Sequence, residues 1–166
     1  GKGSNQSIAA AKLGARTIML GAVGDDSFGK ELRAVLLRHG VDASGVKVQS
    51  RTSTGVAVIQ VAEGDNAITG AAGANAAFSA AMVRAKPRKS DIWVAQFETP
   101  LATTEALLRK ARAAGARTIL NLAPMVPHAA RLLKLIDIAV LNEIELAQAT
   151  GARDRKSTRL NSSHAN

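Results

Sequence analysis

The sequence predicts an α/β fold in which a mainly parallel sheet is flanked by helices on both faces. Segments with helical apolar spacing alternate with short apolar runs that are typical of strands. Glycines close several of the expected helices, and the links between segments are short, which favours parallel strands joined by right-handed crossovers. The chain has 166 residues, of which 46% are hydrophobic and 21% charged, as expected for one globular domain.

The first expected elements are a helix over about 6–13, closed by Gly14, and a strand over about 17–23. A second helix ends at Gly40, where a left-handed cap belongs. Its apolar residues recur at the spacing of one helical face and are Phe28, Leu32, Val35 and Leu36.

Residues 55–61 and 67–69, joined through the turn residues 63–66, predict an antiparallel hairpin. After this β-only interruption we expect a helix capped by Ser79 and a helix starting after Pro127. The other expected strands cover 92–97, 118–122 and 138–141, and the other helices cover 103–114 and 142–151. Functional sites in such sheets lie beyond the carboxyl ends of the strands.

The composition excludes several classes of protein. The chain has no cysteine, which removes disulfide scaffolds, thiolate zinc sites and cysteine nucleophiles and fits a reducing compartment. No apolar run approaches the roughly 18–20 residues that a membrane span needs, so no membrane partner is expected. The net charge of +9 suggests nucleic-acid binding, but the cations are spread over several expected helices and only 2% of the residues are aromatic. Nucleic acid is therefore disfavoured as a partner.

The last residues, 152–166, have no apolar periodicity, so we expect a disordered tail after a domain formed by residues 1–151. The tail resembles translated adapter sequence of the kind that terminates mis-assembled gene models. Because the chain also begins at Gly1 rather than at Met, we expect it to be truncated at both ends.

A glycine-rich segment, Gly1-Lys2-Gly3-Ser4-Asn5-Gln6, precedes the first expected helix. Glycines allow close approach of the backbone, and the free amides of a helix N-terminus bind oxygen-rich ligands. Lys2 and Asn5 add side-chain donors. A glycine turn followed by a helix that Asn5 caps explains the same residues. The segment lacks the spacing of a Walker A phosphate loop.

This segment, with Gly14 and with Gly24-Asp25-Asp26-Ser27-Phe28-Gly29, resembles the N-terminal signature of the ribokinase-like (PfkB) carbohydrate kinases. Later segments occur in that family's order: Ser53-Thr54-Gly55-Val56-Ala57, Ala72-Gly73-Ala74-Asn75, Asn121-Leu122-Ala123-Pro124 and Asn142-Glu143-Ile144-Glu145. The similarity covers residues 1–151 and is greatest to the ribokinase branch. It implies a ribokinase-like α/β fold in which the hairpin over about 55–69 is part of a lid over the sugar.

By this resemblance, Gly1, Lys2 and Asn5 would bind sugar hydroxyls. Glu98, directly after an expected strand, would accept hydrogen bonds from the sugar, a task that suits a carboxylate. Without the resemblance, Glu98 is equally well explained as a charge that favours the N-terminus of the helix after it.

Asn142 and Glu145 match the family's Asn-x-x-Glu element, which is associated with the nucleotide phosphates and their Mg²⁺. The resemblance therefore implies ATP and Mg²⁺ as cofactors, with Glu145 acting indirectly on the metal, and a monovalent cation such as K⁺ in the intact protein. Asn at the cap with Glu three residues later is also a capping box, so both explanations stay open.

Asp25 and Asp26 suggest a carboxylate pair, and Gly21-Ala22-Val23-Gly24-Asp25 imitates the family's catalytic Gly-Ala-Gly-Asp element. We assign neither aspartate to catalysis, because both lie in the N-terminal signature, where one of them is expected to cap the next helix. The family's catalytic aspartate is expected beyond this chain. The histidines have no metal-binding spacing and are His39, His128 and His164.

The resemblance therefore implies a cytoplasmic sugar kinase that transfers the γ-phosphate of ATP to D-ribose or a related sugar and forms a homodimer through the lid. Because the resembled family carries its base in the C-terminal half, this chain is expected to be inactive by itself. The alternatives are a fructokinase, a nucleoside kinase or a 2-keto-3-deoxygluconate kinase, or a non-catalytic basic α/β module that binds nucleic acid.

Overall fold

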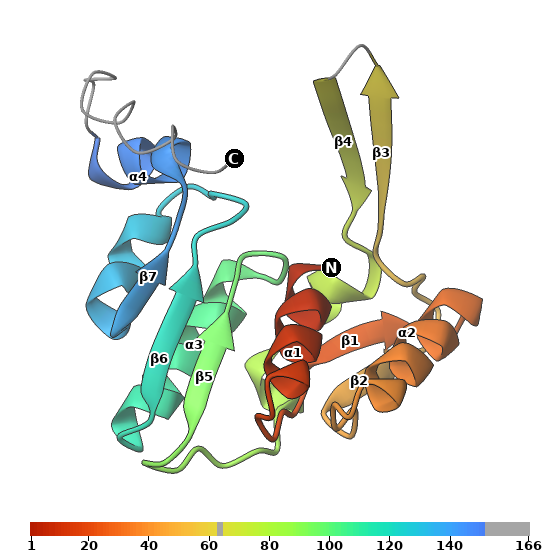
Figure 1. Ribbon diagram of the computed structural model, residues 1–166, viewed down its shortest axis with the longest axis horizontal. Helices are drawn as coiled ribbons and strands as arrows, with labels where there is room; N and C mark the ends of the chain where they lie inside the picture. Colours follow the sequence, from red (N-terminus) through yellow and green to blue (C-terminus); the bar gives the residue numbers. More distant parts are fainter. Residues whose placement is uncertain (63–64, 152–166) are drawn as a thin grey trace.

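The computed structural model describes residues 1–62 and 65–151, which form the predicted α/β fold (Figure 1). The expected turn at Glu63 and Gly64 and the tail over 152–166 lie outside the described residues. The strand pairs other than the hairpin are parallel, as predicted, but they form two separate sheets rather than one. In the described part of the chain, no helix is long and apolar enough to cross a membrane.

The first sheet pairs β1 (Gly21–Gly24) with β2 (Val46–Gln49), and it is accompanied by α1 (Lys2–Lys12) and α2 (Ser27–Arg38). Gly40 follows α2 with a φ of 75°, which confirms the predicted left-handed end of this helix. The core of this part is built from buried residues of β1, α2, β2 and the α2–β2 loop: Val23, Leu36, Val41, Ala43 and Val46.

Three details of this region differ from the sequence prediction. Only an isolated bridge between Ile18 and Asp42 precedes β1, so the strand is shorter than expected. Strand β2 was not predicted, because it is only four residues long and gives little periodic signal. Phe28 is 57% exposed and lies outside the core, since α2 instead turns Gly29 toward β1. A Cβ at Gly29 would overlap the carbonyl oxygen of Gly24.

The second sheet has the order β5 (Ile92–Ala95), β6 (Arg117–Asn121) and β7 (Ile138–Val140). Two helical elements, α3 (Leu101–Ala113) and the 3₁₀ helix η3 (Ala129–Leu135), pack on one of its faces (Figure 1). The largest side chains that are fully buried in this core are Leu108, Leu120, Leu122 and Leu132. They come from α3, from β6 and the residue after it, and from η3, so helix and strand share one apolar layer.

Two of the predicted helices are short 3₁₀ segments. The helix expected at Ser79 covers only η2 (Ala80–Met82), without a side-chain cap, and Pro87 prevents a helix from continuing through this region. The helix expected after Pro127 is η3. By contrast, α4 (Glu143–Thr150) is an α-helix, and Gly151 ends it in the left-handed conformation, as predicted.

A small third core joins the two sheets. Trp93 of β5 and Leu107 of α3 pack against four buried side chains, which are Ala22, Ala74, Phe78 and Val83. Because Ala22 belongs to β1, this cluster connects the first sheet to the second through side-chain packing rather than through strand pairing.

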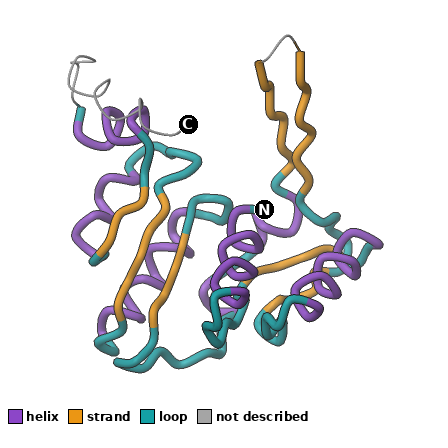
Figure 2. The backbone as a smooth tube through the Cα atoms, in the orientation of Figure 1, coloured by secondary structure: helices purple, strands orange, loops and turns teal. Residues whose placement is uncertain are grey.

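The predicted antiparallel hairpin is formed by β3 (Val56–Ala62) and β4 (Asp65–Ala71), with Val56 opposite Ala71. It stands away from the rest of the molecule (Figure 2). Its base leads into the 3₁₀ helix η1 (Gly73–Ala77), next to β1. Within the described residues, neither outer edge of the hairpin pairs with another strand.

One face of the second sheet is apolar and is left uncovered by the described residues. Val94 and Ile138 flank Ile119 in the register of the three strands, and they are 53% and 44% exposed. Ile92 and Val140 extend the same face and are 60% and 48% exposed. Parallel sheets normally bury both faces, so this surface favours association of the chain.

We expect the double substitution Val94→Lys with Ile138→Lys to raise the monomer fraction of the 166-residue chain, because it places two charges in the centre of this face. The matched control is Leu13→Lys with Leu37→Lys, at positions that are 89% and 61% exposed outside both sheets. Sedimentation velocity measures the monomer fraction. An equal gain from both pairs would show that this face does not drive association.

Candidate functional site

The first candidate site lies where the start of α1 meets the carboxyl end of β5. The backbone amide of Lys2 donates a hydrogen bond to Oε2 of Glu98 over 2.6 Å. Phe97 is only 5% exposed, and its packing in the core places Glu98 at the edge of the sheet. Because α1 has no acidic residue in its first turn, Glu98 supplies the negative charge that a helix N-terminus favours.

Gly1 is the N-cap of α1 and also lies against Glu98. A Cβ on Gly1 would be 2.6 Å from Oε2 of Glu98, so a side chain at this position would displace the carboxylate. Glu98 is also explained as a charge that favours the helix after it, but among the described residues its carboxylate forms a hydrogen bond only with α1. The carboxylate binds α1, and the following helix α3 has Pro100 as its N-cap with no side-chain cap bond.

The glycine-rich segment is the first turn of α1 rather than a loop before it. The amide of Asn5 donates to the carbonyl of Gly1 over 3.2 Å, so Asn5 is already helical and the alternative of an Asn5 cap is wrong. The helix begins early because Glu98 accepts the hydrogen bond of the Lys2 amide, which would otherwise lack a partner. The structure thus brings Gly1, Lys2 and Glu98 together and leaves Asn5 exposed one turn away.

The sequence prediction missed Gln96, which is part of the same site. Its Oε1 accepts a hydrogen bond from the backbone amide of Glu98 over 2.9 Å. Its amide nitrogen lies against Gly3 of α1. A polar residue near the end of the strand expected over 92–97, two positions before a candidate carboxylate, was the available signal.

The second candidate site is at the start of α4, directly beyond β7. Oδ1 of Asn142 accepts from the amide of Glu145, and Oε2 of Glu145 accepts from the amide of Asn142, both over 2.8 Å. The capping box that the spacing allowed is therefore present. Its role toward a nucleotide stays a prediction. Within the described ranges, no group of three His, Cys, Asp or Glu side chains is placed to hold a metal ion.

Both candidate sites lie at the same edge of the second sheet, because β5 and β7 are parallel to β6 and each site follows the carboxyl end of its strand. At the end of β6, which lies between them, Oδ1 of Asn121 accepts from the amide of Ala123 over 3.1 Å, ahead of a cis bond to Pro124. Open α/β sheets bind ligands at this edge, so the geometry allows one ligand-binding face that includes both sites.

Asp26 caps α2, as predicted, and also holds the base of the hairpin. Its Oδ1 accepts from the amide of Gly29 over 2.8 Å and from the hydroxyl of Thr54 over 2.6 Å, while Oδ2 accepts from the amide of Thr54 over 2.7 Å. These hydrogen bonds, that of the Thr54 hydroxyl above all, lower the pKa of Asp26. A fully hydrogen-bonded cap explains this carboxylate without a catalytic role.

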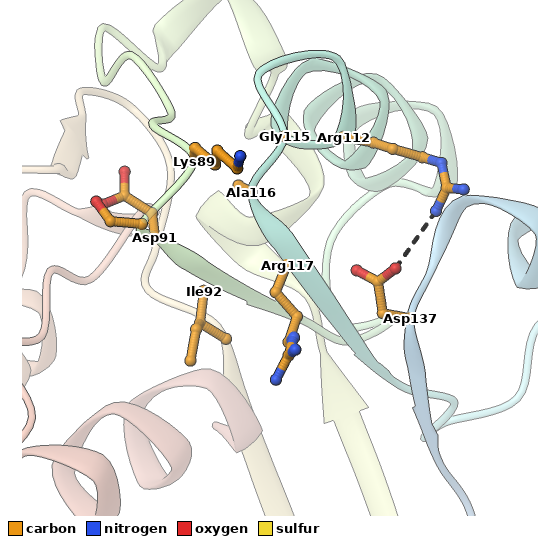
Figure 3. A pocket seen from close by; sticks show the side chains of 9 residues that line it. Lys89, Asp91, Ile92, Arg112, Gly115, Ala116, Arg117 and Asp137 are labelled. Atoms are coloured by element: carbon orange, nitrogen blue, oxygen red, sulfur yellow. Dashed lines mark ion pairs between the residues drawn. The ribbon is translucent and has the colours of Figure 1, made fainter.

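A cavity of about 620 Å³ opens at the opposite end of the sheet, at the amino ends of β5 and β6 (Figure 3). Lys89, Arg112 and Arg117 come from three separate segments and line it, and Arg112 pairs with Asp137 over 3.6 Å. Cations that are dispersed in the sequence are therefore neighbours here. Arg112 lies in the last turn of α3, where positive charge is favoured. The residues of the two candidate sites do not line this cavity.

Comparison with known proteins relates the chain to carbohydrate kinases. A model described as pfkB family carbohydrate kinase matches residues 1–165. Ribokinase from Haemophilus influenzae is 39% identical over 155 residues, which are 91% of this chain and 51% of that protein. Ribokinase from Schizosaccharomyces pombe is 36% identical over 166 residues, with 95% and 52% coverage. The chain therefore spans about half the length of the curated relatives it matches.

Solved structures give the same result. The structure of Arabidopsis thaliana ribokinase complexed with ribose and ATP has a TM-score of 0.78 and 33% identity, covering 91% of this chain and 51% of that one. Ribokinase from Giardia lamblia has a TM-score of 0.79 and 30% identity, covering 92% and 50%. The α/β fold with parallel strands is thus shared with ribokinases over nearly the whole chain.

The lowered pKa of Asp26 predicts a specific pH dependence of stability. A carboxyl whose folded-state pKa lies below its unfolded value of about 3.9 stabilises the fold above that pH, and this contribution is lost as the pH falls through the folded-state pKa. Asp26→Asn should therefore lower Tm at pH 7 and reduce the further fall of Tm on acidification, as followed by circular dichroism. In the matched control Asp25→Asn, Tm at pH 7 should stay close to that of the unmodified chain, because the hydrogen bonds from Gly29 and Thr54 go to Asp26.

The capping box predicts that Asn142→Ala destabilises α4 by about 1 kcal/mol, whereas Asn142→Asp retains the cap. Hydrogen exchange of the α4 amides should become roughly fivefold faster in the alanine variant and stay nearly unchanged in the aspartate variant. Equal protection in the alanine variant would mean that this cap does not hold the helix.

Proposed function

This chain belongs to the pfkB family of carbohydrate kinases, and on that premise we propose that the intact protein transfers the γ-phosphate of ATP to a hydroxyl of D-ribose or a closely related sugar. The observation that carries the proposal is the hydrogen bond of the Glu98 carboxylate with the Lys2 amide at the start of α1. The Arabidopsis thaliana relative, whose structure was solved with ribose and ATP, supports the choice of substrates.

The chemistry of this site suits a sugar. Hydroxyl groups both donate and accept hydrogen bonds, and the site offers a carboxylate acceptor at Glu98 beside backbone donors at the start of α1. Lys2 and Asn5 are three residues apart on α1, so their side chains project from neighbouring positions of the helix surface. We assign Gly1, Lys2, Asn5 and Glu98 to sugar binding on this basis.

The nucleotide is assigned to the start of α4, with Asn142 and Glu145 toward its phosphates. Mg²⁺ keeps several waters and binds phosphates with one or two protein carboxylates, which fits a site with a single candidate carboxylate. When bound, the ion would neutralise charge on the transferring phosphate. The capping box uses Oε2 of Glu145, and we assign Glu145 an indirect effect on the metal, as the family resemblance implies. The helix N-terminus itself adds amide donors on the side of the phosphates.

Phosphoryl transfer also needs a base for the acceptor hydroxyl. The family resemblance assigns this aspartate to residues outside the chain, so we expect the 166-residue chain to bind sugar without turnover. We further assign the intact protein to the cytoplasm, because ATP is present there and a chain without cysteine fits a reducing compartment. We also assign it to a homodimer formed through the hairpin, whose outer edges have no strand partner among the described residues.

The test compares Glu98→Gln with Glu31→Gln, a matched change on the exposed surface of α2, outside both candidate sites. In the intact protein, coupled ADP release with D-ribose should lose about 10- to 100-fold in kcat/KM on Glu98→Gln, because a charged acceptor is lost, and should be unchanged on Glu31→Gln. The same assay with fructose, nucleosides and 2-keto-3-deoxygluconate distinguishes the other kinases.

Two outcomes would contradict the proposal. If none of these acceptors supports ADP release by the intact protein, the kinase assignment fails, and the basic α/β module becomes the better explanation. If the 166-residue chain alone turns over ribose at an enzyme-like rate, the assignment of the base to residues outside the chain fails.

A further inference from the structure

We propose that Gln96 is a positioning residue that holds Glu98 against the first turn of α1; only its consequence for sugar binding rests on the proposed function. Gln96 directly follows β5 and is half-buried. No family motif recognised in the sequence includes it, and its contacts rather than its sequence environment indicate the role.

The side chain of Gln96 fixes the backbone at Glu98. Its Oε1 accepts from the Glu98 amide over 2.9 Å, which closes a tight turn between the strand end and the carboxylate. Phe97, between them, is buried in the core and leaves this turn little freedom. Glu98 then reaches the Lys2 amide over 2.6 Å. The position of the carboxylate therefore depends on the hydrogen bond that Gln96 accepts.

The other end of the Gln96 amide group contacts α1 itself. A Cβ on Gly3 would lie 2.7 Å from Nε2 of Gln96 and 2.9 Å from the terminal methyl of Met19. Glycine inside a helix is less stable than alanine, so Gly3 is explained by this close approach. Gln96 thus touches the helix that Glu98 binds and the turn that carries Glu98.

This arrangement gives the site a preformed acceptor. A carboxylate that is already held in place loses less conformational freedom when a ligand binds, so each hydrogen bond to the ligand contributes more to affinity. We expect Gln96 to act through Glu98 and not by contact with the sugar.

The direct test is the NMR signal of the Lys2 amide proton in the 166-residue chain. Glu98→Gln should move this signal upfield, because a neutral acceptor forms a weaker hydrogen bond than a carboxylate. Gln96→Met, which keeps the size of the side chain but loses the acceptor, should move it in the same direction although residue 96 has no hydrogen bond to Lys2. Gln148→Met on the exposed side of α4 is the control and should leave it in place.

A second pair of variants tests the contact with α1. Gly3→Ala alone should not raise Tm, because the new methyl group collides with Gln96. In a Gln96→Ala background the same substitution should raise Tm by about 2–4 °C, since only the helix preference of alanine and a movable methionine end remain. An identical change in Tm in both backgrounds, or a Lys2 signal that ignores Gln96→Met, would overturn the proposal.

Ribose binding separates this proposal from the proposed function. If the chain binds ribose in calorimetry, Gln96→Met should weaken the affinity about tenfold. The control Gln148→Met should leave the affinity unchanged. Absence of ribose binding by every form of the protein would count against the function, whereas the Lys2 signal and the Gly3 variants would still decide the role of Gln96.

Discussion

The hydrogen bond from the Lys2 amide to Glu98 is the constraint on which the candidate sugar site depends. It joins two positions that are 96 residues apart in the chain, and it replaces the acidic residue that α1 lacks in its own first turn. Gly1 and Gly3 are explained by the same constraint, because side chains there would collide with Glu98 and with Gln96. The carboxylate at the helix end thus restricts which residues the first turn of α1 can contain.

Asp26 makes a comparable link at the base of the hairpin. The buried Thr54 donates its hydroxyl to Asp26 and accepts from the amide of Gly24, so β1, α2 and the segment before β3 meet at one side chain. Gly73, on the other side of the hairpin, has a φ of 50° and a position where a Cβ would overlap the carbonyl of Ser53. The hairpin therefore leaves the body of the protein from a tightly packed and hydrogen-bonded base.

The sequence correctly predicted features that depend on neighbouring residues alone, such as helix ends and caps. Gly40, Gly115 and Gly151 all adopt positive φ after helices, and the Asn142 capping box is present as its spacing suggested.

Contacts between distant segments could not be predicted in this way. Nothing near Lys2 in sequence announces Glu98 as its partner, so the helix start was placed too late, and Gln96 was missed because its partners are a backbone amide and a glycine. Phe28 fits the apolar face by spacing, but the close approach of Gly29 to β1 leaves Phe28 exposed.

The small core between the two sheets contains the only tryptophan of the chain. Trp93 lies on β5 and packs with residues that include Ala22 of β1, and among the described residues no strand pairing connects the two sheets. Separation of the sheets would change the surroundings of this indole, whereas fraying of the hairpin or of α4 would not. Because the chain has one tryptophan and no tyrosine, its fluorescence spectrum comes mainly from Trp93. A change in that spectrum would therefore show that the two sheets no longer pack against each other.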